Sequence, residues 1–131
     1  MITWKNMDTL ASYAELCGCE KLNLAAAMAG ENGANRVKSY TVPMGAGMDF
    51  NYGARPVDDK ILAVLEKFAA EQQMVEKFAA LYNGEVINTG EKRLVLHHLC
   101  RGQLGNDVIA DGVNKREFYL DEQQKIADFA N

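Results

Sequence analysis

The chain has 131 residues, of which 48% are hydrophobic and 24% are charged. This length and composition are typical of a soluble globular protein that buries ~two-thirds of its unfolded surface in one core. The net charge is −4 and the pI is near 5.2, with no local concentration of lysine and arginine. Proteins that bind nucleic acids gather basic residues on one face, so the charge argues against a nucleic-acid partner.

The sequence also lacks the patterns of membrane and secreted proteins. It contains no run of about 18 apolar residues, and Met1–Lys5 has neither the basic start nor the apolar core of a secretory signal. The cysteines Cys17, Cys19 and Cys100 are odd in number, and the first two lie too close for an ordinary structural disulfide. We therefore expect reduced thiols, a cytoplasmic location and no membrane partner.

Two short helices are predicted at the start of the chain. Apolar residues recur at helical spacing from Asp8 to Cys17, behind an aspartate cap, and Gly18 ends the pattern. A second helix is predicted from Lys21 to Ala29, with Gly30 as its stop. Because the connection is short, the two helices are expected to pack as an antiparallel pair.

A β-hairpin is predicted next, from Val37 to Tyr52. Residues Arg36 to Val42 alternate between two faces, Pro43 interrupts the pattern, and a period of two resumes at Met48. Two strands alone are marginally stable in water, so this hairpin must lean on the helices or join another sheet.

The strongest helical pattern begins at Pro56 and Asp58 and continues to Tyr82, with a bend expected near Gln72-Gln73. Asn83-Gly84 is expected to end it with a left-handed cap. A further helix is predicted from Glu91 to Cys100, closed by Gly102, and then a loop from Gln103 to Asn114.

A final helix is predicted from Phe118 to Ala130, and it is still amphipathic where the sequence stops. Natural termini usually carry a glycine, a proline or a polar tail after the last apolar turn, so we expect a truncated chain. The predicted fold class is α+β, mostly helical with one β-hairpin.

The segment from Asn83 to Arg101 carries a more specific signal, because its turn, cap and helix-face residues follow a recognisable order. It resembles the signature G-E-x-I-N-x-T-E-x-R-A-V-L-H-x-A-L-R of the glucose-6-phosphate isomerase family. The residues in register are Gly84, Glu85, Ile87, Asn88, Glu91, Arg93, Val95, Leu96, His97 and Arg101. Weaker similarity to the family's strand, helix and I-L-V-D-G runs covers Met48 to Gly53, Val57 to Leu62 and Val108 to Gly112.

A few positions depart from the family pattern. Gly90 stands where the family has threonine, and Thr89 is expected to take over the capping role. Leu94, Leu99 and Cys100 replace alanine, alanine and leucine, which we interpret as repacking with apolar side chains.

The resemblance implies that residues 1–131 form a single N-terminal segment of an α/β/α sugar-isomerase-type enzyme. In that family the enzyme interconverts glucose 6-phosphate and fructose 6-phosphate through an enediol, in glycolysis and gluconeogenesis, as a homodimer without a cofactor. The catalytic sugar-isomerase domains and the sugar-phosphate site lie beyond this segment. The resemblance therefore predicts no catalytic, cofactor-binding or metal-binding residue here and no activity for the isolated chain, whose partner is the remainder of the isomerase.

His97 and His98 are candidates for a catalytic role, because the chain has no other histidine. On a helix, His97 and His98 point ~100° apart. His97 is in line with Arg93 and Arg101 at four-residue spacing, which favours a hydrogen-bonded structural role and leaves direct involvement in chemistry as the alternative. His98 is expected at the surface or at an interface.

Other candidate sites have weaker support. Gly45-Ala46-Gly47 lies at a hairpin tip, whereas phosphate loops join a strand to a helix. Cys17, Cys19, His97 and His98 lack the gaps of two to four residues that zinc ligand pairs prefer. The charged residues Glu85, Glu91, Arg93 and Arg101 are expected to satisfy turn amides and helix ends, with Glu91 and Arg101 complementing the helix dipole.

A different class of protein remains as the rival hypothesis: a free-standing helical interaction or ligand-binding module derived from the same family. Exposed apolar surface discriminates between the two. A segment that packs on missing domains leaves its hairpin face and the Phe129 end uncovered, whereas a self-sufficient module is monomeric and covers them.

Overall fold

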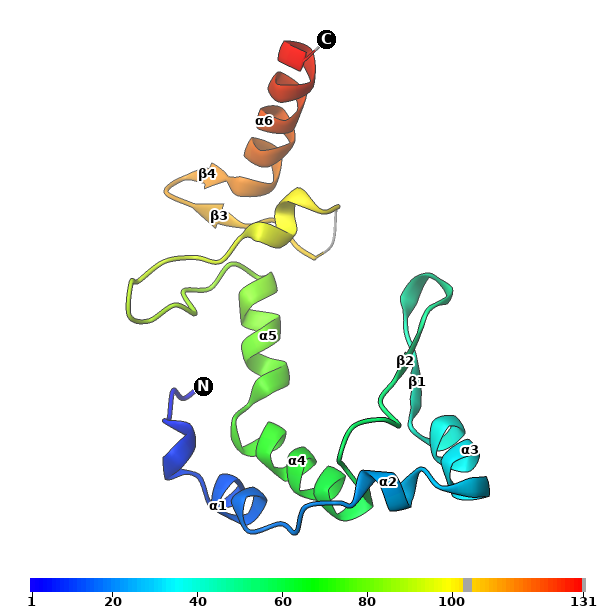
Figure 1. Cartoon of the computed structure of the whole chain (residues 1–131). Helices are drawn as coiled ribbons and strands as arrows, with labels where there is room; N and C mark the ends of the chain where they lie inside the picture. Colours follow the sequence, from blue (N-terminus) through cyan, green and yellow to red (C-terminus); the bar gives the residue numbers. More distant parts are fainter. Residues whose placement is uncertain (103–104, 131) are drawn as a thin grey trace. The chain divides into compact units, whose positions relative to one another are not determined.

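The computed structural model describes residues 1–102 and 105–130, and the chain divides into two compact units (Figure 1). The first unit is Lys5–Glu71. The second unit combines Met1–Trp4 with the chain from Gln72 onward. Helices predominate, and two small antiparallel hairpins accompany them, which confirms the α+β fold class and corrects the number of hairpins from one to two.

The first unit contains six helical segments, two of them 3₁₀, and one hairpin. In chain order these are the 3₁₀ helix η1 (Met7–Thr9), α1 (Ala11–Cys17), α2 (Leu24–Ala27), α3 (Gly30–Ser39), β1 (Thr41–Pro43), the 3₁₀ turn η2 (Gly45–Gly47), β2 (Asp49–Asn51) and α4 (Asp59–Glu71). The second unit contains α5 (Met74–Tyr82), the 3₁₀ helix η3 (His97–Cys100), β3 (Ile109–Ala110), β4 (Val113–Asn114) and α6 (Lys115–Ala130).

Helix α1 packs on α4, and the predicted pairing of the first two helices is wrong. The rings of Tyr13 and Phe68 lie 6.1 Å apart between centroids, and Val64 is buried on α4. The second helix shrinks to the single turn α2, capped by Asn23, whose side chain accepts a hydrogen bond from Ala26 N–H. One turn offers little apolar surface, so α1 uses the longer stripe of α4 instead.

The start of α1 also differs from the prediction. Asp8 belongs to η1, and Leu10 is the N-cap of α1, without a side-chain cap bond. Gly18 does end α1, as predicted. Gly30 is the first residue of α3, where a helix stop was expected.

The hairpin is confirmed but is shorter than predicted. Thr41 pairs with Asn51, Val42 with Phe50 and Pro43 with Asp49. Residues 37–39, predicted as strand, are the end of α3, where Val37 is 43% exposed. Their alternation therefore did not reflect burial on one face of a sheet, and it carried no strand signal.

The predicted long helix is interrupted at the predicted place, because Gln73 between α4 and α5 has a positive φ of 54°. The end of α5 is a Schellman motif. Gly84 has φ +73°, its N–H donates to Leu81 O (3.1 Å), and Glu85 N–H donates to Ala80 O (2.9 Å). The predicted Asn83-Gly84 cap is confirmed.

The predicted helix from Glu91 to Cys100 is wrong. Asn88 and Arg93 form an isolated β-bridge, Lys92 has φ +54°, and only His97–Cys100 is helical, as the 3₁₀ turn η3. Leu94 and Leu96 would lie ~200° apart on an α-helix and could not share one core. The 3₁₀ turn, with three residues per turn, brings Leu96 and Leu99 to the same side.

A small apolar core forms from these residues. Leu96, Leu99 and Val108 are buried, and Leu94 and Tyr119 pack against them. The second hairpin, within the loop predicted from Gln103 to Asn114, pairs Ile109 with Asn114 and Ala110 with Val113. Gln103 itself lies outside the described residues.

The last helix begins three residues earlier than predicted. Asn114 Oδ1 accepts a hydrogen bond from Arg116 N–H (3.1 Å), which caps α6. Near its other end, Ile126 is 68% exposed and Phe129 is 94% exposed. Among the described residues, no helix combines the length and the apolar character that crossing a membrane requires.

Candidate ligand-binding cavity

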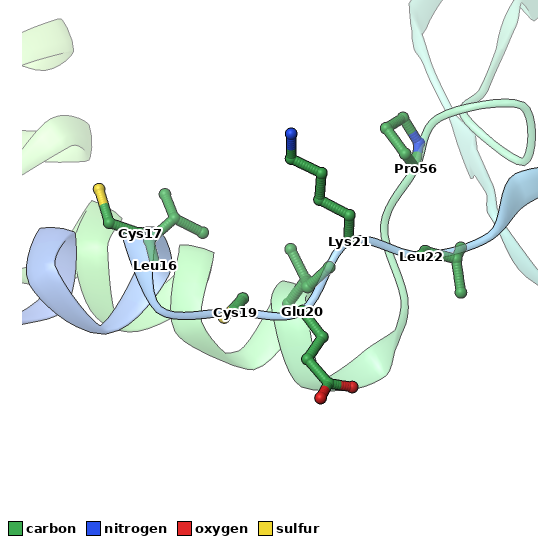
Figure 2. Close-up of a pocket in the computed structure, with 8 residues that line it drawn as sticks. Leu16, Cys17, Cys19, Glu20, Lys21, Leu22 and Pro56 are labelled. Carbon is green, nitrogen blue, oxygen red and sulfur yellow. The ribbon is translucent and has the colours of Figure 1, made fainter.

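A cavity of about 470 Å³ lies in the first unit, where α1 ends and α4 begins (Figure 2). Helix α1 stops at Gly18, whose N–H bonds to Ala14 O and Glu15 O, both at 3.1 Å. The chain then runs without regular structure until α2 begins at Leu24. The last residues of α1, this connection, and the chain from Pro56 into the first turn of α4 form the walls of the cavity.

The walls combine an apolar lining with a few polar groups. The apolar side chains come from Leu16, Leu22, Pro56 and Ile61. Ile61 is held in the first turn of α4, where its N–H donates to the capping Asp58 Oδ1 (2.8 Å). The polar lining comes from Cys17, Cys19, Glu20 and Lys21.

The polar groups of the cavity diverge. In Figure 2 the Cys17 thiol and the Lys21 ammonium extend to one side of the connecting segment, and the Glu20 carboxylate extends to the other. Cys19 Sγ lies 3.5 Å from Glu15 O and donates to it. A hydrogen bond with the Cys17 side chain raises the pKa of the Tyr13 hydroxyl above its usual value.

A smaller cavity of about 310 Å³ lies in the second unit. Its lining residues are Phe78, Leu81, Tyr82, Val95, His97, His98 and Arg101. The structure therefore brings both histidines and Arg101 to one place. No Asp or Glu is among its described lining residues, so this cavity lacks a carboxylate base.

The two histidines have exchanged the environments that the sequence predicted. His97 is exposed, whereas His98 is half-buried and stacks on Tyr82 with ring centroids 4.5 Å apart. His98 Nε2 lies 3.2 Å from Tyr82 O, while Nδ1 is a buried atom without a partner within the described structure. The exchange follows from the loss of the predicted helix.

The remaining predicted side chains are dispersed. Glu91 Oε2 accepts from Asn88 Nδ2 (3.2 Å), and its N–H donates to Asn88 Oδ1 (3.2 Å). Glu85, Arg93 and Arg101 are exposed. The helix dipole that Glu91 and Arg101 were expected to complement does not exist, so that part of the prediction is wrong.

The residues considered as metal ligands or as a phosphate loop do not form a common site within either unit. All three cysteines are free thiols, as expected, and Cys17 and Cys19 share the first unit's cavity. The histidines belong to the other unit, and no group of three metal-ligating side chains forms within the described ranges. Gly45-Ala46-Gly47 forms η2 at the hairpin tip, with Ala46 at φ 59°.

No pattern in the sequence predicts the first unit's cavity. Of its polar residues, only Cys17 and Cys19 were candidates, and they were weighed as metal ligands. Lys21 was assigned to a helix that begins three residues later, at Leu24. No spacing pattern links residues 16–22 with Pro56 and Ile61, because the packing of α1 on α4 brings them together.

Comparison with known proteins places this chain in a class of sugar-phosphate isomerases. The family model described as phosphoglucose isomerase matches residues 51–131. The chain is 48% identical to a glucose-6-phosphate isomerase of Treponema denticola, over 97% of the chain and 25% of that protein. It is 38% identical to a glucose-6-phosphate isomerase of Treponema pallidum (98% and 25%), and 37% identical to one of Borrelia garinii subsp. bavariensis (99% and 24%).

The chain therefore belongs to the phosphoglucose isomerase family, which confirms the resemblance of the Asn83 to Arg101 segment. It spans about a quarter of the length of the curated relatives it matches.

Proposed function

We propose that this chain is the N-terminal part of a glucose-6-phosphate isomerase, and that the complete enzyme interconverts glucose 6-phosphate and fructose 6-phosphate by enediol proton transfer. The observation that carries the proposal is the similarity over 97% of the chain, at 48% identity, to a quarter of an enzyme with that name. In this interpretation residues 1–131 are one N-terminal segment, and the catalytic sugar-isomerase domains lie outside it.

The reaction requires a base that moves a proton between adjacent carbons, an acid that opens the sugar ring, and donors that hold the phosphate. Neither of the two cavities described above assembles this set. The first unit's cavity places Glu20 and Lys21 on opposite sides of the chain, and the second unit's cavity lacks a carboxylate. These observations support an inactive isolated chain, with the sugar phosphate bound only by the complete enzyme.

The amount of exposed surface supports the role of a segment that packs on further domains. Two separate globular units of about 7 kDa would expose roughly 8,300 Å² in total, whereas the chain exposes 9944 Å². The hairpin contributes four exposed apolar side chains, which are Val42, Met44, Met48 and Phe50. Phe129 is exposed as well. A self-sufficient module, the rival hypothesis, would cover these side chains.

The remaining expectations belong to the same proposal. The complete enzyme is a homodimer without a cofactor, it works in the cytoplasm in glycolysis and gluconeogenesis, and it has no nucleic-acid or membrane partner. The net charge of −4 supports the absence of a nucleic-acid partner.

The test is a coupled assay of two purified proteins. Fructose 6-phosphate is supplied, and a dehydrogenase specific for glucose 6-phosphate reports the product. We expect no turnover above the blank from residues 1–131 and clear turnover from the polypeptide encoded by the whole reading frame. An inactive whole-frame protein would refute the proposed enzyme, and turnover by residues 1–131 alone would refute the proposed inactivity.

A second measurement separates the proposal from its rival. Light scattering and hydrophobic-dye fluorescence are recorded for the isolated chain and for the hairpin variant Phe50→Ser/Met48→Ser. We expect self-association and dye binding that the variant reduces. A monomeric chain that binds no dye would favour the self-sufficient module.

A further inference from the structure

The first unit's cavity has properties that the isomerase reaction does not use. Its volume of about 470 Å³ lies within the range of small-molecule sites. Its apolar side chains come from both sides, with Leu16 on α1, Leu22 on the connecting segment and Ile61 on α4. Sugar phosphates carry a hydroxyl on nearly every carbon and need many polar partners, so this lining suits a more apolar molecule.

Among the charged side chains that line the cavity, Lys21 is the cation that can contact a bound anion. Glu15, the nearest acid on α1, is bound to Lys67, with Nζ to Oε1 at 2.8 Å and Nζ to Oε2 at 3.1 Å. Glu20 extends away from Lys21 (Figure 2). Glu20 also lines a neighbouring hollow, together with Asp58 and Lys60. The ion pairs of the described residues join Lys67 to Glu15 and Lys125 to Glu122, and Lys21 is in neither pair.

We propose that this cavity binds a small apolar anion, such as an aromatic or short aliphatic carboxylate or sulfonate. The apolar body lies against Leu16, Leu22, Pro56 and Ile61, and the anionic group faces Lys21 Nζ. The Cys17 thiol extends to the same side as Lys21, so a bound ligand shields it (Figure 2). The site is independent of the proposed isomerase reaction, because none of these residues is assigned to that reaction.

The experiment measures protection of Cys17 from alkylation in the full 131-residue chain. The probe is naphthalene-2-sulfonate, its neutral counterpart is naphthalene-2-sulfonamide, and the reagent is iodoacetamide, which is uncharged. Peptide mass spectrometry follows Cys17 and Cys100 separately, and Cys100 in the second unit is the internal control. We expect the sulfonate to slow alkylation of Cys17 saturably while the rate at Cys100 stays unchanged.

Variants of Lys21 test the ionic contact. Lys21 is exposed, so its substitution leaves the fold intact. We expect Lys21→Gln to weaken the apparent affinity for the sulfonate about three- to fivefold, which is the size of effect expected for an exposed ion pair. The apparent affinity for the sulfonamide should stay unchanged. Lys21→Arg retains the affinity for the sulfonate. Lys60→Gln is the matched control, because Lys60 lines the neighbouring hollow and not this cavity.

Four results would overturn the proposal. They are an absence of saturable protection at Cys17, equal protection at Cys100, unchanged sulfonate affinity in Lys21→Gln, and stronger protection by glucose 6-phosphate than by the sulfonate. Failure of the isomerase assay would leave all four measurements unaffected, so the two proposals fail separately.

Discussion

The contacts that stabilise the inside of the first unit differ from those that stabilise the inside of the second unit. In the first unit, polar side chains join distant segments. Arg36, only 8% exposed, donates to Gly53 O (2.7 Å), to Arg55 O (2.9 Å) and to Val57 O. The second unit also has a buried arginine, Arg116, which donates to Asn106 O (2.9 Å). What distinguishes the second unit is the apolar cluster of Leu96, Leu99 and Val108, which α6 covers through Tyr119.

This difference shows which substitutions each unit tolerates. The cluster has only three buried side chains, so truncating one of them removes a large part of the apolar surface that the cluster buries. The first unit depends instead on acceptors that must stay satisfied, because an unpaired buried carbonyl destabilises the fold. The predictions that follow test this contrast from the largest expected effect to the smallest.

The apolar side of the contrast is tested by Leu99→Ala. Leu99 is 1% exposed, and its truncation is expected to lower the free energy of unfolding by about 3 kcal/mol. Urea unfolding followed by the fluorescence of Trp4, the one tryptophan of the chain and part of the second unit, measures the change. Leu120→Ala is the control, because Leu120 is 44% exposed and its truncation removes little burial. Equal effects of the two substitutions would contradict the assigned core.

A close contact at the end of α5 gives the next largest effect. A Cβ at Gly84 would lie 2.2 Å from Val108 Cγ1, and Gly84 has φ +73°. Gly84→Ala is therefore expected to cost about 2 kcal/mol, from backbone strain and from displacement of the core. Gly112→Ala separates the two causes, because Gly112 also has φ +73° and no neighbouring atom within 4 Å.

The double variant Gly84→Ala/Val108→Ala sharpens this test. Removing the methyl groups of Val108 relieves the clash, so the two substitutions should cost less together than their sum in urea unfolding. Strict additivity would show that the alanine at residue 84 does not press on the core.

The polar side of the contrast is tested by Arg36→Gln. Glutamine cannot reach the three carbonyls that the guanidinium bonds, and the expected loss is about 1.5 kcal/mol. Arg36→Lys should recover little of it, because an ammonium lacks the planar fork that spans separated acceptors. Amide exchange in β1 and β2 measures the effect, and Arg55→Gln, an exposed position, is the control. Unchanged protection of the hairpin in Arg36→Gln would show that other contacts position it.

The sequence predicted those parts of the fold whose signals are local. The apolar stripe of α4, the interruption at Gln73 and the glycine cap after Tyr82 depend on residues within a few positions of one another. The hairpin of β3 and β4 also had a local signal, since Asp111-Gly112 supplies positive φ at both turn positions. That signal was present in the sequence and was missed.

The errors concern segments whose structure depends on distant contacts. Residues 91–100 have apolar side chains at helical and at non-helical spacing. The structure they adopt is the one in which Leu96 and Leu99 pack with Val108 and Tyr119. The cavity was unpredictable for the same reason, because Lys21 and Ile61 share it only after α1 packs on α4. Family resemblance could not locate the cavity either, because its signature covers Asn83 to Arg101, in the other unit.

The smallest expected effect is a pH dependence confined to the first unit. Glu71 Oε2 accepts hydrogen bonds from Ser12 Oγ and from Ser12 N–H (3.0 Å), and these bonds, the hydroxyl's first, hold the pKa of the carboxyl below its ordinary value of 4.5. Because the pKa is lower in the folded state, the stabilisation is fully present above pH 4.5 and is lost as the pH falls through the folded-state pKa.

Amide-exchange protection in α1, measured from pH ~6 down to pH ~3, should therefore decline toward the acid end. Ser12→Ala removes the hydroxyl and keeps the backbone bond, so the decline should become shallower without disappearing. Glu71→Gln should remove this contribution altogether, whereas Glu66→Gln, at an exposed position of the same helix, should leave the profile unchanged. A profile that is identical in the wild type and in Glu71→Gln would mean that this carboxylate does not fasten α1 to α4, and the exposed ion pair of Lys67 with Glu15 would then be the polar side-chain contact left between these two helices.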